Sequence, residues 1–261
     1  MSLTYTRSGN PNSPAIIFLH GMAMGQWMWL DQTQHFADYD CYNVDLPGHG
    51  GSSQIAWGSF GQTADRIAQF IESAVIGKPV YLVGMSLGAI IGLHILVRYP
   101  RLIKRAVLTG AIAERPPRWM IKLQGGLLSV MLPTGFGKRL FARTLQIPAD
   151  AMPAYTESIN ALSMPAFKQI VAEVTDYTPP ANYSLIQTPT LFATGDKDVV
   201  VNLNAVKLLA RQVPASCGVY APGLHHGWNG EAPALFNTMT RAWIQESSLP
   251  QSLISAESAP T

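Results

Sequence analysis

The chain has 261 residues, a formal net charge of +2 and an apolar fraction of 48%. This length allows one or two domains, and the apolar content is sufficient for one large buried core. A charge so close to neutral predicts no nucleic-acid partner and no general attraction to membrane surfaces. The two cysteines, Cys41 and Cys217, lie far apart in predicted strands, so we expect buried free thiols, no disulfide and no metal site.

The first apolar run, Ala15–Leu19, has the length of a strand. It is too short for the hydrophobic region of a signal peptide or for a membrane span. No other run in the sequence approaches the length of a transmembrane helix. We therefore expect a cytoplasmic protein without a membrane span.

Short apolar runs alternate with segments of helical spacing along most of the chain. The predicted strands are Leu3–Arg7, Ala15–Leu19, Tyr39–Val44, Val80–Val83, Arg105–Leu108 and Thr190–Ala193, with a last strand that ends at Val219–Ala221. The predicted helices are Thr63–Val75, Ser86–Tyr99, Leu203–Val213 and Glu231–Trp243. Strands that alternate with helices indicate an α/β fold, in which a mostly parallel sheet is flanked by helices on both faces.

One region breaks this alternation. Residues 113–183 contain three apolar stripes of helical spacing and no convincing strand. We predict that residues 113–183 form a helical cap, or lid, inserted between two late strands of a core made of residues 1–112 and 184–249. Such an insertion begins after the carboxyl end of a strand, where ligand sites lie in open α/β sheets. The Ser- and Ala-rich residues 250–261 are predicted to be a disordered tail.

The segment Gly84-Met85-Ser86-Leu87-Gly88 follows a predicted strand and opens a predicted helix. A serine on so sharp a turn has strained backbone angles, and small residues two positions to either side let neighbouring segments pass close to it. The helix N-terminus behind the serine supplies free N–H groups and partial positive charge for an oxyanion. This placement predicts that Ser86 is a nucleophile.

A second oxyanion donor should come from the loop that follows the strand Ala15–Leu19, at the same edge of the sheet. We therefore assign the oxyanion hole to the backbone N–H groups of Met22 and Leu87. This assignment depends on the two loops meeting at the carboxyl ends of their strands, which a parallel sheet requires.

Four of the six histidines are interpreted as structural. His20 and His49 lie in glycine-containing loops and are expected, together with Asp45, to hold those loops rather than to react. His35 lies on a predicted surface helix. His94 lies inside the helix that follows Ser86 and is typical of a satisfied core histidine.

A nucleophilic serine needs a base, and the base needs an orienting acid. The candidate acids, Asp196 and Asp198, follow the sixth predicted strand. The candidate bases, His225 and His226, follow the last predicted strand. The residues by themselves leave both choices open.

Together these pieces resemble the α/β-hydrolase superfamily, specifically its small capped serine esterase-like branch. The order Ser, Asp, His along the chain is that of this family. The similar segments extend over nearly the whole chain outside the predicted lid. They are His20-Gly21 with Trp27 or Trp29 downstream, Asp45–Ser53, Gly84–Gly88, Gly195–Asp198, and His226 with Glu231-Ala232-Pro233 after it.

The resemblance implies a particular acid and a particular base. In the family the acid stands three residues after the glycine, which selects Asp198. The histidine precedes a Glu-x-Pro sequence by five positions, which selects His226. One position departs from the pattern, because His225 stands where the family has a glycine. The nucleophile position holds Ser86 and not an aspartate, which argues against a resemblance to haloalkane dehalogenases.

The resemblance further implies a cofactor-free serine hydrolase that cleaves a small-to-medium apolar carboxylic ester through an acyl-enzyme on Ser86. Hydrolysis of a thioester, a lactone or a carbon–carbon bond next to a carbonyl is the neighbouring alternative, as is a lyase that uses the same triad. A non-catalytic ligand receptor on the same scaffold is a third class. Fold-level analogy does not choose among substrates.

The residues expected around Ser86 are apolar, which predicts an apolar ester substrate and little dependence of activity on salt. The expected substrate pocket consists of Trp27, Met85, Leu127, Met131, Phe141 and Phe167. The predicted lid also carries six basic residues, Arg115, Arg118, Lys122, Lys138, Arg139 and Arg143. We interpret them as a solvated helix face, and the alternative is a docking surface for an acidic carrier protein.

Overall fold

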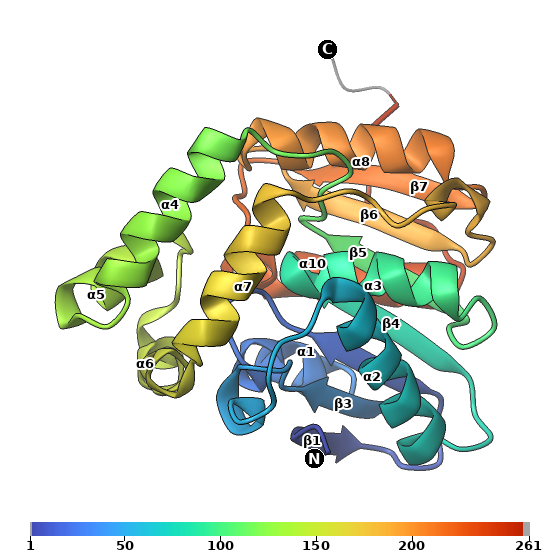
Figure 1. The fold of residues 1–261 in the computed structure, drawn as a ribbon. Helices are drawn as coiled ribbons and strands as arrows, with labels where there is room; N and C mark the ends of the chain where they lie inside the picture. The colour runs from blue at the N-terminus through green and yellow to red at the C-terminus, as the bar shows by residue number, and fades with distance from the viewer. Residues whose placement is uncertain (1, 258–261) are drawn as a thin grey trace.

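In residues 2–257, which the computed structural model describes, an eight-stranded sheet forms the centre of the molecule (Figure 1). Its strands are β1 (Tyr5–Gly9), β2 (Ala15–Leu19), β3 (Asp40–Val44), β4 (Val80–Met85), β5 (Arg105–Thr109), β6 (Thr190–Gly195), β7 (Ser216–Ala221) and β8 (Ile254–Ser255). They lie in the order β1-β3-β2-β4-β5-β6-β7-β8. The edge strands β1 and β8 are antiparallel to their neighbours, and the strands between them are parallel. The predicted α/β fold is confirmed.

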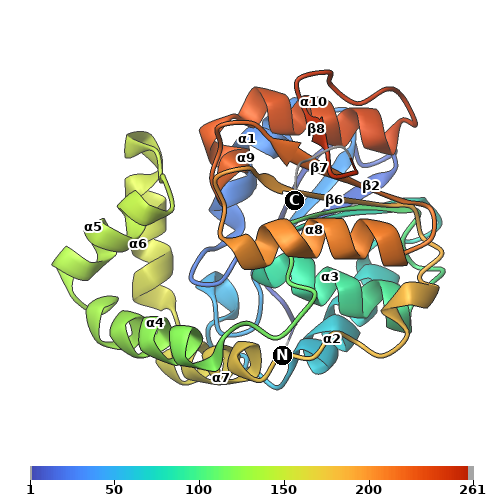
Figure 2. The same ribbon diagram turned by 90° about the horizontal axis from the view of Figure 1, so that it is seen from above.

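Helices cover both faces of the sheet, as Figure 2 shows from above. One face carries α2 (Phe60–Ala74), α3 (Leu87–Arg98) and α8 (Val200–Gln212), and the other carries α1 (Leu30–His35), α9 (Trp228–Glu231) and α10 (Pro233–Ile244). Successive side chains of a strand point to opposite faces. In β2, Ile17 and Leu19 join the core with α2, α3 and α8, whereas Ile16 and Phe18 join the core on the α10 side. Burial on both faces explains why this strand is apolar at every position.

Each of the seven predicted strands is present, with ends that move by at most three residues. The sequence analysis missed α9 and β8, and it expected a surface helix at His35, the last residue of α1, without giving its bounds. The expectation of disorder over residues 250–261 is wrong for residues 250–257, because Ile254–Ser255 pair with β7 and Ala256 is buried. The open backbone edge of β7 supplies the N–H and C=O groups that this short strand satisfies. Residues 258–261 lie outside the described residues.

The segment between β5 and β6 is helical, as predicted. It contains α4 (Arg118–Met131), α5 (Gly135–Thr144), α6 (Met152–Ala161) and α7 (Met164–Thr175), which stand together beside the α/β core in Figures 1 and 2. Glu173 of α7 fastens this segment to the start of α2, since its carboxylate accepts from Trp57 Nε1 (3.0 Å) and from the backbone N–H of Phe60 (2.8 Å). None of the helices in residues 2–257 is both long and apolar enough to cross a membrane.

Two buried histidines brace the loops that follow β2 and β3. His20 Nε2 accepts from the backbone N–H of Leu46 at 3.0 Å, and its Nδ1 lies 2.8 Å from a backbone carbonyl oxygen. His49 Nε2 accepts from the backbone N–H of Ala23 at 3.2 Å, and its Nδ1 lies 3.0 Å from another carbonyl oxygen. Both contacts of each ring are satisfied by the neutral tautomer that carries its proton on Nδ1. The predicted structural role of these histidines is confirmed.

Asp45 holds the same two loops together. One carboxylate oxygen accepts from the backbone N–H of Gln26 at 2.9 Å, and the other accepts from the backbone N–H of Gly51 at 2.9 Å. The carboxylate therefore links the loop after β2 to the loop after β3, as the sequence analysis expected.

These histidines predict how stability depends on pH. Burial lowers the pKa of His20 to about 4 and that of His49 to about 3, from 6.5 in a free side chain. Below pH 6.5 the unfolded chain therefore binds protons that the folded protein does not, so the stability that is present above this pH is lost as the pH falls. Each such histidine contributes a slope of about 1.4 kcal/mol per pH unit.

We expect the free energy of unfolding to fall steeply between pH 6.5 and pH 5, and His49→Gln to make this decline shallower. Glutamine keeps one donor and one acceptor but does not titrate. Urea unfolding curves measured at several pH values for both proteins test the prediction. Equal slopes for the parent and the variant would contradict it.

Candidate active site

Ser86 lies on the sharp turn between β4 and α3, with backbone angles of φ 54° and ψ −111°. A non-glycine residue in this conformation carries strain of about 1–3 kcal/mol. The flanking glycines make the turn possible: a Cβ at Gly84 would lie 2.5 Å from the carbonyl oxygen of Gly88, and a Cβ at Gly88 would overlap the carbonyl oxygen of Leu19. The predicted strand-turn-helix placement of Ser86 is therefore present.

Hydrogen bonds hold this turn against both neighbouring strands. Ser86 N–H donates to the carbonyl oxygen of Thr109 at the end of β5 (2.8 Å), and Gly88 N–H donates to that of His20 after β2 (3.1 Å). Leu87 is the first residue of α3, and the first N–H groups of a helix have no intrahelical acceptor. Met22 and Leu87 line the same cavity as Ser86.

Asp198 and His226 form a hydrogen-bonded pair beside this cavity. His226 Nδ1 lies 2.8 Å from Asp198 Oδ2, which orients the ring if Nδ1 carries the proton and leaves Nε2 as the acceptor. The side chain of Asp198 is only 2% exposed, and that of His226 is 25% exposed. The acid is therefore shielded from water, whereas the histidine reaches the cavity.

Further donors keep Asp198 ionised. Thr194 Oγ1 donates to Oδ2 at 2.5 Å, and the backbone N–H of Val199 donates to Oδ1 at 2.7 Å. Burial by itself would raise the pKa of Asp198, but the hydrogen bonds from His226, Thr194 and Asn202 outweigh burial and hold this pKa below its usual value.

Asn202 is a site residue that the sequence analysis missed. Its Nδ2 donates to Asp198 Oδ2 at 2.9 Å and lies 3.0 Å from His226 Nδ1. Asn202 lies in the first turn of α8, four residues after Asp198. This spacing was the signal in the sequence that could have found it. Asn202 therefore touches both members of the pair.

The alternative acid and base are engaged elsewhere. Asp196 Oδ1 accepts from the backbone N–H of Gly223 at 2.7 Å and thus braces a turn. His225 is held away from the cavity by Glu231, which accepts from the His225 backbone N–H at 3.0 Å and lies 3.0 Å from its Nδ1. The geometry therefore pairs the two residues that the family resemblance selects, Asp198 and His226.

The cavity that contains Ser86 has a volume of about 270 Å³. Besides Ser86, Asp198, Asn202 and His226, it is lined by Met22, Leu87, Ile90, Gly110, Ile112, Ile121, Gln124, Ile170, Val174 and Val199. Asp198 is the one ionised carboxylate among them, and no lysine or arginine is present. The walls are therefore almost entirely neutral.

The six predicted pocket residues do not line this cavity. Trp27 and Met85 lie at a separate small cavity of about 50 Å³. Leu127, Met131 and Phe141 line a groove between α4 and α5, and Phe167 is fully buried in the core of the helical segment. The prediction failed because α4 is apolar on several sides, and the side that reaches the cavity carries Ile121 and Gln124 instead.

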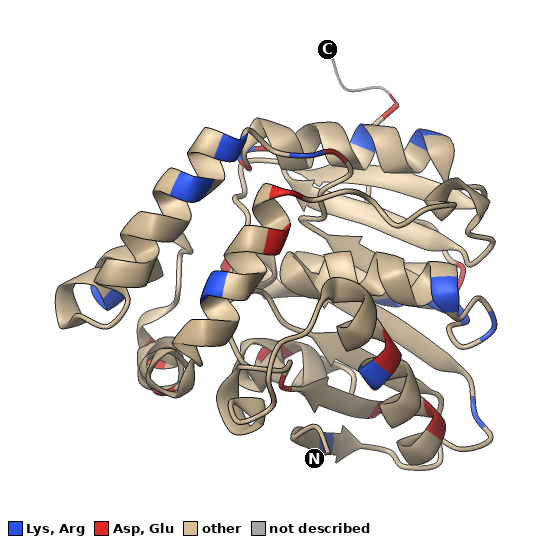
Figure 3. Ribbon diagram, in the orientation of Figure 1, with Lys and Arg blue, Asp and Glu red and all other residues tan. Residues whose placement is uncertain are grey.

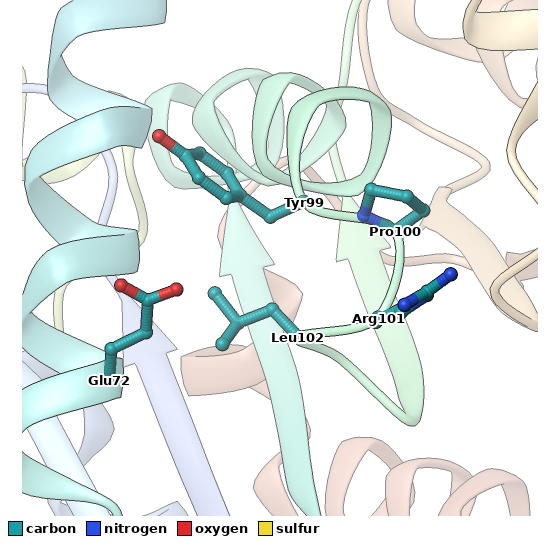
Figure 4. Close-up of a pocket in the computed structure, with 5 residues that line it drawn as sticks. All are labelled: Glu72, Tyr99, Pro100, Arg101 and Leu102. Carbon is teal, nitrogen blue, oxygen red and sulfur yellow. The ribbon is translucent and has the colours of Figure 1, made fainter.

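A larger cavity, of about 520 Å³, lies at the opposite end of the sheet (Figure 4). Tyr99, Pro100, Arg101 and Leu102 of the loop before β5 line it, with Glu72 of α2. Parallel strands place ligand sites at their carboxyl ends, and this loop precedes a strand. Size alone therefore does not identify the active site.

The described residues contain no obvious metal centre. Among residues 2–257, no three His, Cys, Asp or Glu side chains are grouped in a way that could hold a metal ion. Cys41 and Cys217 are both free thiols; Cys41 is buried as expected, whereas Cys217 is only partly buried, and burial raises the pKa of both.

Sequence comparison finds relatives with several chemistries. The chain is 26% identical over 241 residues to an (E)-2-((N-methylformamido)methylene)succinate hydrolase of Acinetobacter baylyi, which covers 88% of this chain and 90% of that protein. It is 28% identical over 176 residues to a 2-succinyl-6-hydroxy-2,4-cyclohexadiene-1-carboxylate synthase of an Enterobacter species, over 63% of this chain and 68% of that protein.

Structural comparison supports the same fold. An esterase from Thermogutta terrifontis superposes with a TM-score of 0.78 over 94% of this chain and 93% of that one, at 18% identity. At this identity the likeness shows the fold alone. The family model described as the alpha/beta hydrolase fold matches residues 14–227, which is most of the chain. The chain therefore belongs to the α/β-hydrolase fold family.

Proposed function

We propose that this chain is a serine hydrolase that cleaves small-to-medium apolar carboxylic esters through an acyl-enzyme on Ser86. The observation that carries the proposal is a single cavity that contains Ser86 and a hydrogen-bonded Asp198–His226 pair. A hydroxyl nucleophile, a histidine base and an orienting carboxylate are the three groups of a catalytic triad. Membership of a hydrolase family supports the same reaction class.

In the first half-reaction, His226 Nε2 takes the hydroxyl proton of Ser86 as Oγ attacks the ester carbonyl carbon. The carbonyl electron pair moves onto oxygen, and the oxyanion accepts hydrogen bonds from the backbone N–H groups of Met22 and Leu87. The bond to the alcohol oxygen then breaks, and His226 donates its proton to that oxygen. Asp198 stays ionised and stabilises the imidazolium.

In the second half-reaction, a water molecule replaces the alcohol. His226 removes one proton from the water, and the resulting hydroxide adds to the acyl carbon. The new oxyanion occupies the same two N–H groups. Its collapse breaks the bond to Ser86 Oγ, which recovers its proton from His226, and the carboxylic acid leaves.

The neutral cavity supports an apolar substrate. Both curated relatives have names that contain a carboxylate or a succinate, whereas the cavity of this chain has no lysine or arginine to pair with such an anion. An anion bound there would lose hydration without gaining an ion pair, which is costly in a poorly solvated site. Neutral acyl groups fit the isoleucine and valine walls.

Residues 113–183 act as a lid in this proposal. Ile121 and Gln124 of α4, with Ile170 and Val174 of α7, contribute to the walls of the cavity that holds Ser86. A cover of this kind excludes bulk water and strengthens the hydrogen bonds to the oxyanion. The proposed core consists of residues 1–112 and 184–249.

A lyase that uses the same residues is the second candidate. It is favoured by the resemblance to the Enterobacter synthase. In such a reaction His226 would move a substrate proton and no acyl-enzyme would form on Ser86. A covalent intermediate on Ser86 therefore distinguishes the two candidates.

The substrate class is tested with two activated esters of matched length, p-nitrophenyl butyrate and the p-nitrophenyl monoester of succinate. We expect kcat/KM to be at least about tenfold higher for the neutral ester, which corresponds to about 1.4 kcal/mol, and to change little with salt. An organophosphonate should label Ser86, and Ser86→Ala should abolish both labelling and turnover. Preference for the anionic ester would contradict the substrate class, and full activity of Ser86→Ala would contradict the mechanism.

A second prediction separates the paired residues from their neighbours. We expect His226→Ala and Asp198→Asn to lower kcat by about 10³-fold or more, because the proton acceptor or its orientation is lost. The matched controls, His225→Ala and Asp196→Asn, should lose far less. Kinetics on p-nitrophenyl butyrate measure all four variants. A reversed ranking at either pair would move the role to the neighbouring residue.

Gly110 limits where His226 can lie. It has φ +63°, and a Cβ at this position would lie 2.6 Å from Cε1 of His226. Gly223 has a similar φ of +75°, but a Cβ there would meet nothing within 4 Å. The two glycines thus share the backbone strain of a substitution and differ in the contact with the imidazole.

We expect Gly110→Ala to lower kcat at least about tenfold by displacing His226, since small misplacements of reacting groups are costly. Gly223→Ala should retain most of the activity. Both alanines place a Cβ in the left-handed region at a cost of about 1–2 kcal/mol, so both should lower the melting temperature. Equal kinetics for the two variants would show that the ring of His226 tolerates the displacement.

A further inference from the structure

The helices α4 and α5 expose an unusual number of large apolar side chains. Six of the thirteen exposed large hydrophobic residues in residues 2–257 lie here. They are Trp119 (71% exposed), Leu123 (65%), Leu127 (57%) and Val130 (73%) of α4, and Phe136 (73%) and Leu140 (42%) of α5. We call these six residues the α4–α5 apolar face.

The α4 members of this face follow one side of the helix, because they recur at intervals of four, four and three residues. A different side of α4 packs against α7, where Gly125 is buried against Val171. The helix is therefore apolar on two sides, and only one of these is covered by the described protein. Large exposed apolar side chains that gather on one side of a helix mark an interaction site.

The charged residues of α4 and α5 themselves have one sign. Residues 115–149 contain six lysines and arginines and no aspartate or glutamate, although the whole chain has a net charge of only +2. The rest of the chain is therefore net negative. Arg139 and Arg143 stand three and seven residues after Phe136, on the same side of α5, and Figure 3 shows the basic bands on α4 and α5 without an acidic one.

We propose that the α4–α5 apolar face docks on an anionic lipid surface. An exposed row of Trp, Phe and Leu with flanking Lys and Arg is the pattern of a helix that lies in a membrane interface. The apolar side chains enter the boundary between headgroups and acyl chains, and the cations near the surface are attracted to anionic lipids.

Two other occupants fit these observations less well. In a symmetric dimer the same patch would face itself, which brings the cations of one copy against those of the other, and of these Arg118 is paired with a carboxylate, Asp176. An acidic protein would match the charge, but pairing with an acidic surface would leave the large apolar side chains against polar groups. A lipid surface satisfies the charge and the apolar residues together.

The face also leads toward Ser86. Leu127 and Leu140 line a groove of about 300 Å³ between α4 and α5, together with Leu128, Met131 and Phe141. Gln124 lines both this groove and the cavity that holds Ser86. A docked lipid could thus supply an acyl chain to the proposed hydrolase, although the docking itself does not depend on the catalytic assignment.

Trp119 provides a direct probe, because it is the exposed one among the six tryptophans of the chain, all of which the structure describes. The intact protein is mixed with vesicles of phosphatidylcholine alone or of phosphatidylcholine with phosphatidylglycerol. We expect cosedimentation and a blue shift of tryptophan emission with the anionic vesicles, both reduced by high salt. Trp119→Phe should keep the cosedimentation and lose most of the blue shift.

The matched variants are Leu123→Glu and Leu185→Glu. The two leucines are similarly exposed, at 65% and 67%, but Leu123 belongs to the α4–α5 apolar face and Leu185 does not. Because moving a leucine side chain out of water is favourable, Leu123→Glu should weaken vesicle binding at least about tenfold, whereas Leu185→Glu should not. Ser86→Ala should bind vesicles like the parent, which separates this proposal from the catalytic one.

Three results would overturn the docking proposal. The first is that the protein does not bind anionic vesicles. The second is that Leu123→Glu and Leu185→Glu weaken vesicle binding equally. The third is that light scattering shows a concentration-dependent dimer, which Leu123→Glu disrupts, while the protein does not bind vesicles. The last would assign the face to a second copy of the chain.

Discussion

The turn at Ser86 is the constraint on which the rest of the site depends. Its strained backbone brings the end of β4 and the start of α3 so close to β2 that Gly88 has room for hydrogen alone beside the carbonyl oxygen of Leu19. The same approach lets Ser86 N–H reach Thr109 and Gly88 N–H reach His20. The loops after β2 and β5 are thereby held against the turn that carries Ser86, and the strain is offset by the surrounding sheet.

Among the residues that line the cavity beside this turn, Asp198 is the one ionised carboxylate. Asp198 is almost fully buried, yet donors from Thr194, Asn202, Val199 and His226 keep it ionised. The cavity beside it is otherwise neutral. In the proposed reaction this arrangement suits His226 as the base, because the imidazolium that forms has its counter-ion, Asp198, in place.

In the helical segment between β5 and β6, two sides of α4 belong to two different surfaces. The side of α4 that carries Ile121 and Gln124 meets the cavity, while the side that carries Trp119, Leu123 and Leu127 is exposed among basic residues. In our proposals the first side covers the substrate and the second meets a lipid surface. Net charge over the whole chain conceals this second surface, because an acidic remainder balances the basic segment.

The sequence by itself determined the alternation of strands and helices, the turn at Ser86 and the bracing roles of His20 and His49, since each depends on local spacing and residue type. It left Asp196 and Asp198 unresolved without the family resemblance, because either can follow β6 and only the approach of the β7 loop brings His226 to one of them. The pocket was decided by tertiary structure alone. Helix α4 is apolar in several directions, so its periodicity cannot show which side meets Ser86; the contact of Gly125 with Val171, which sets how α4 lies against α7, makes that choice.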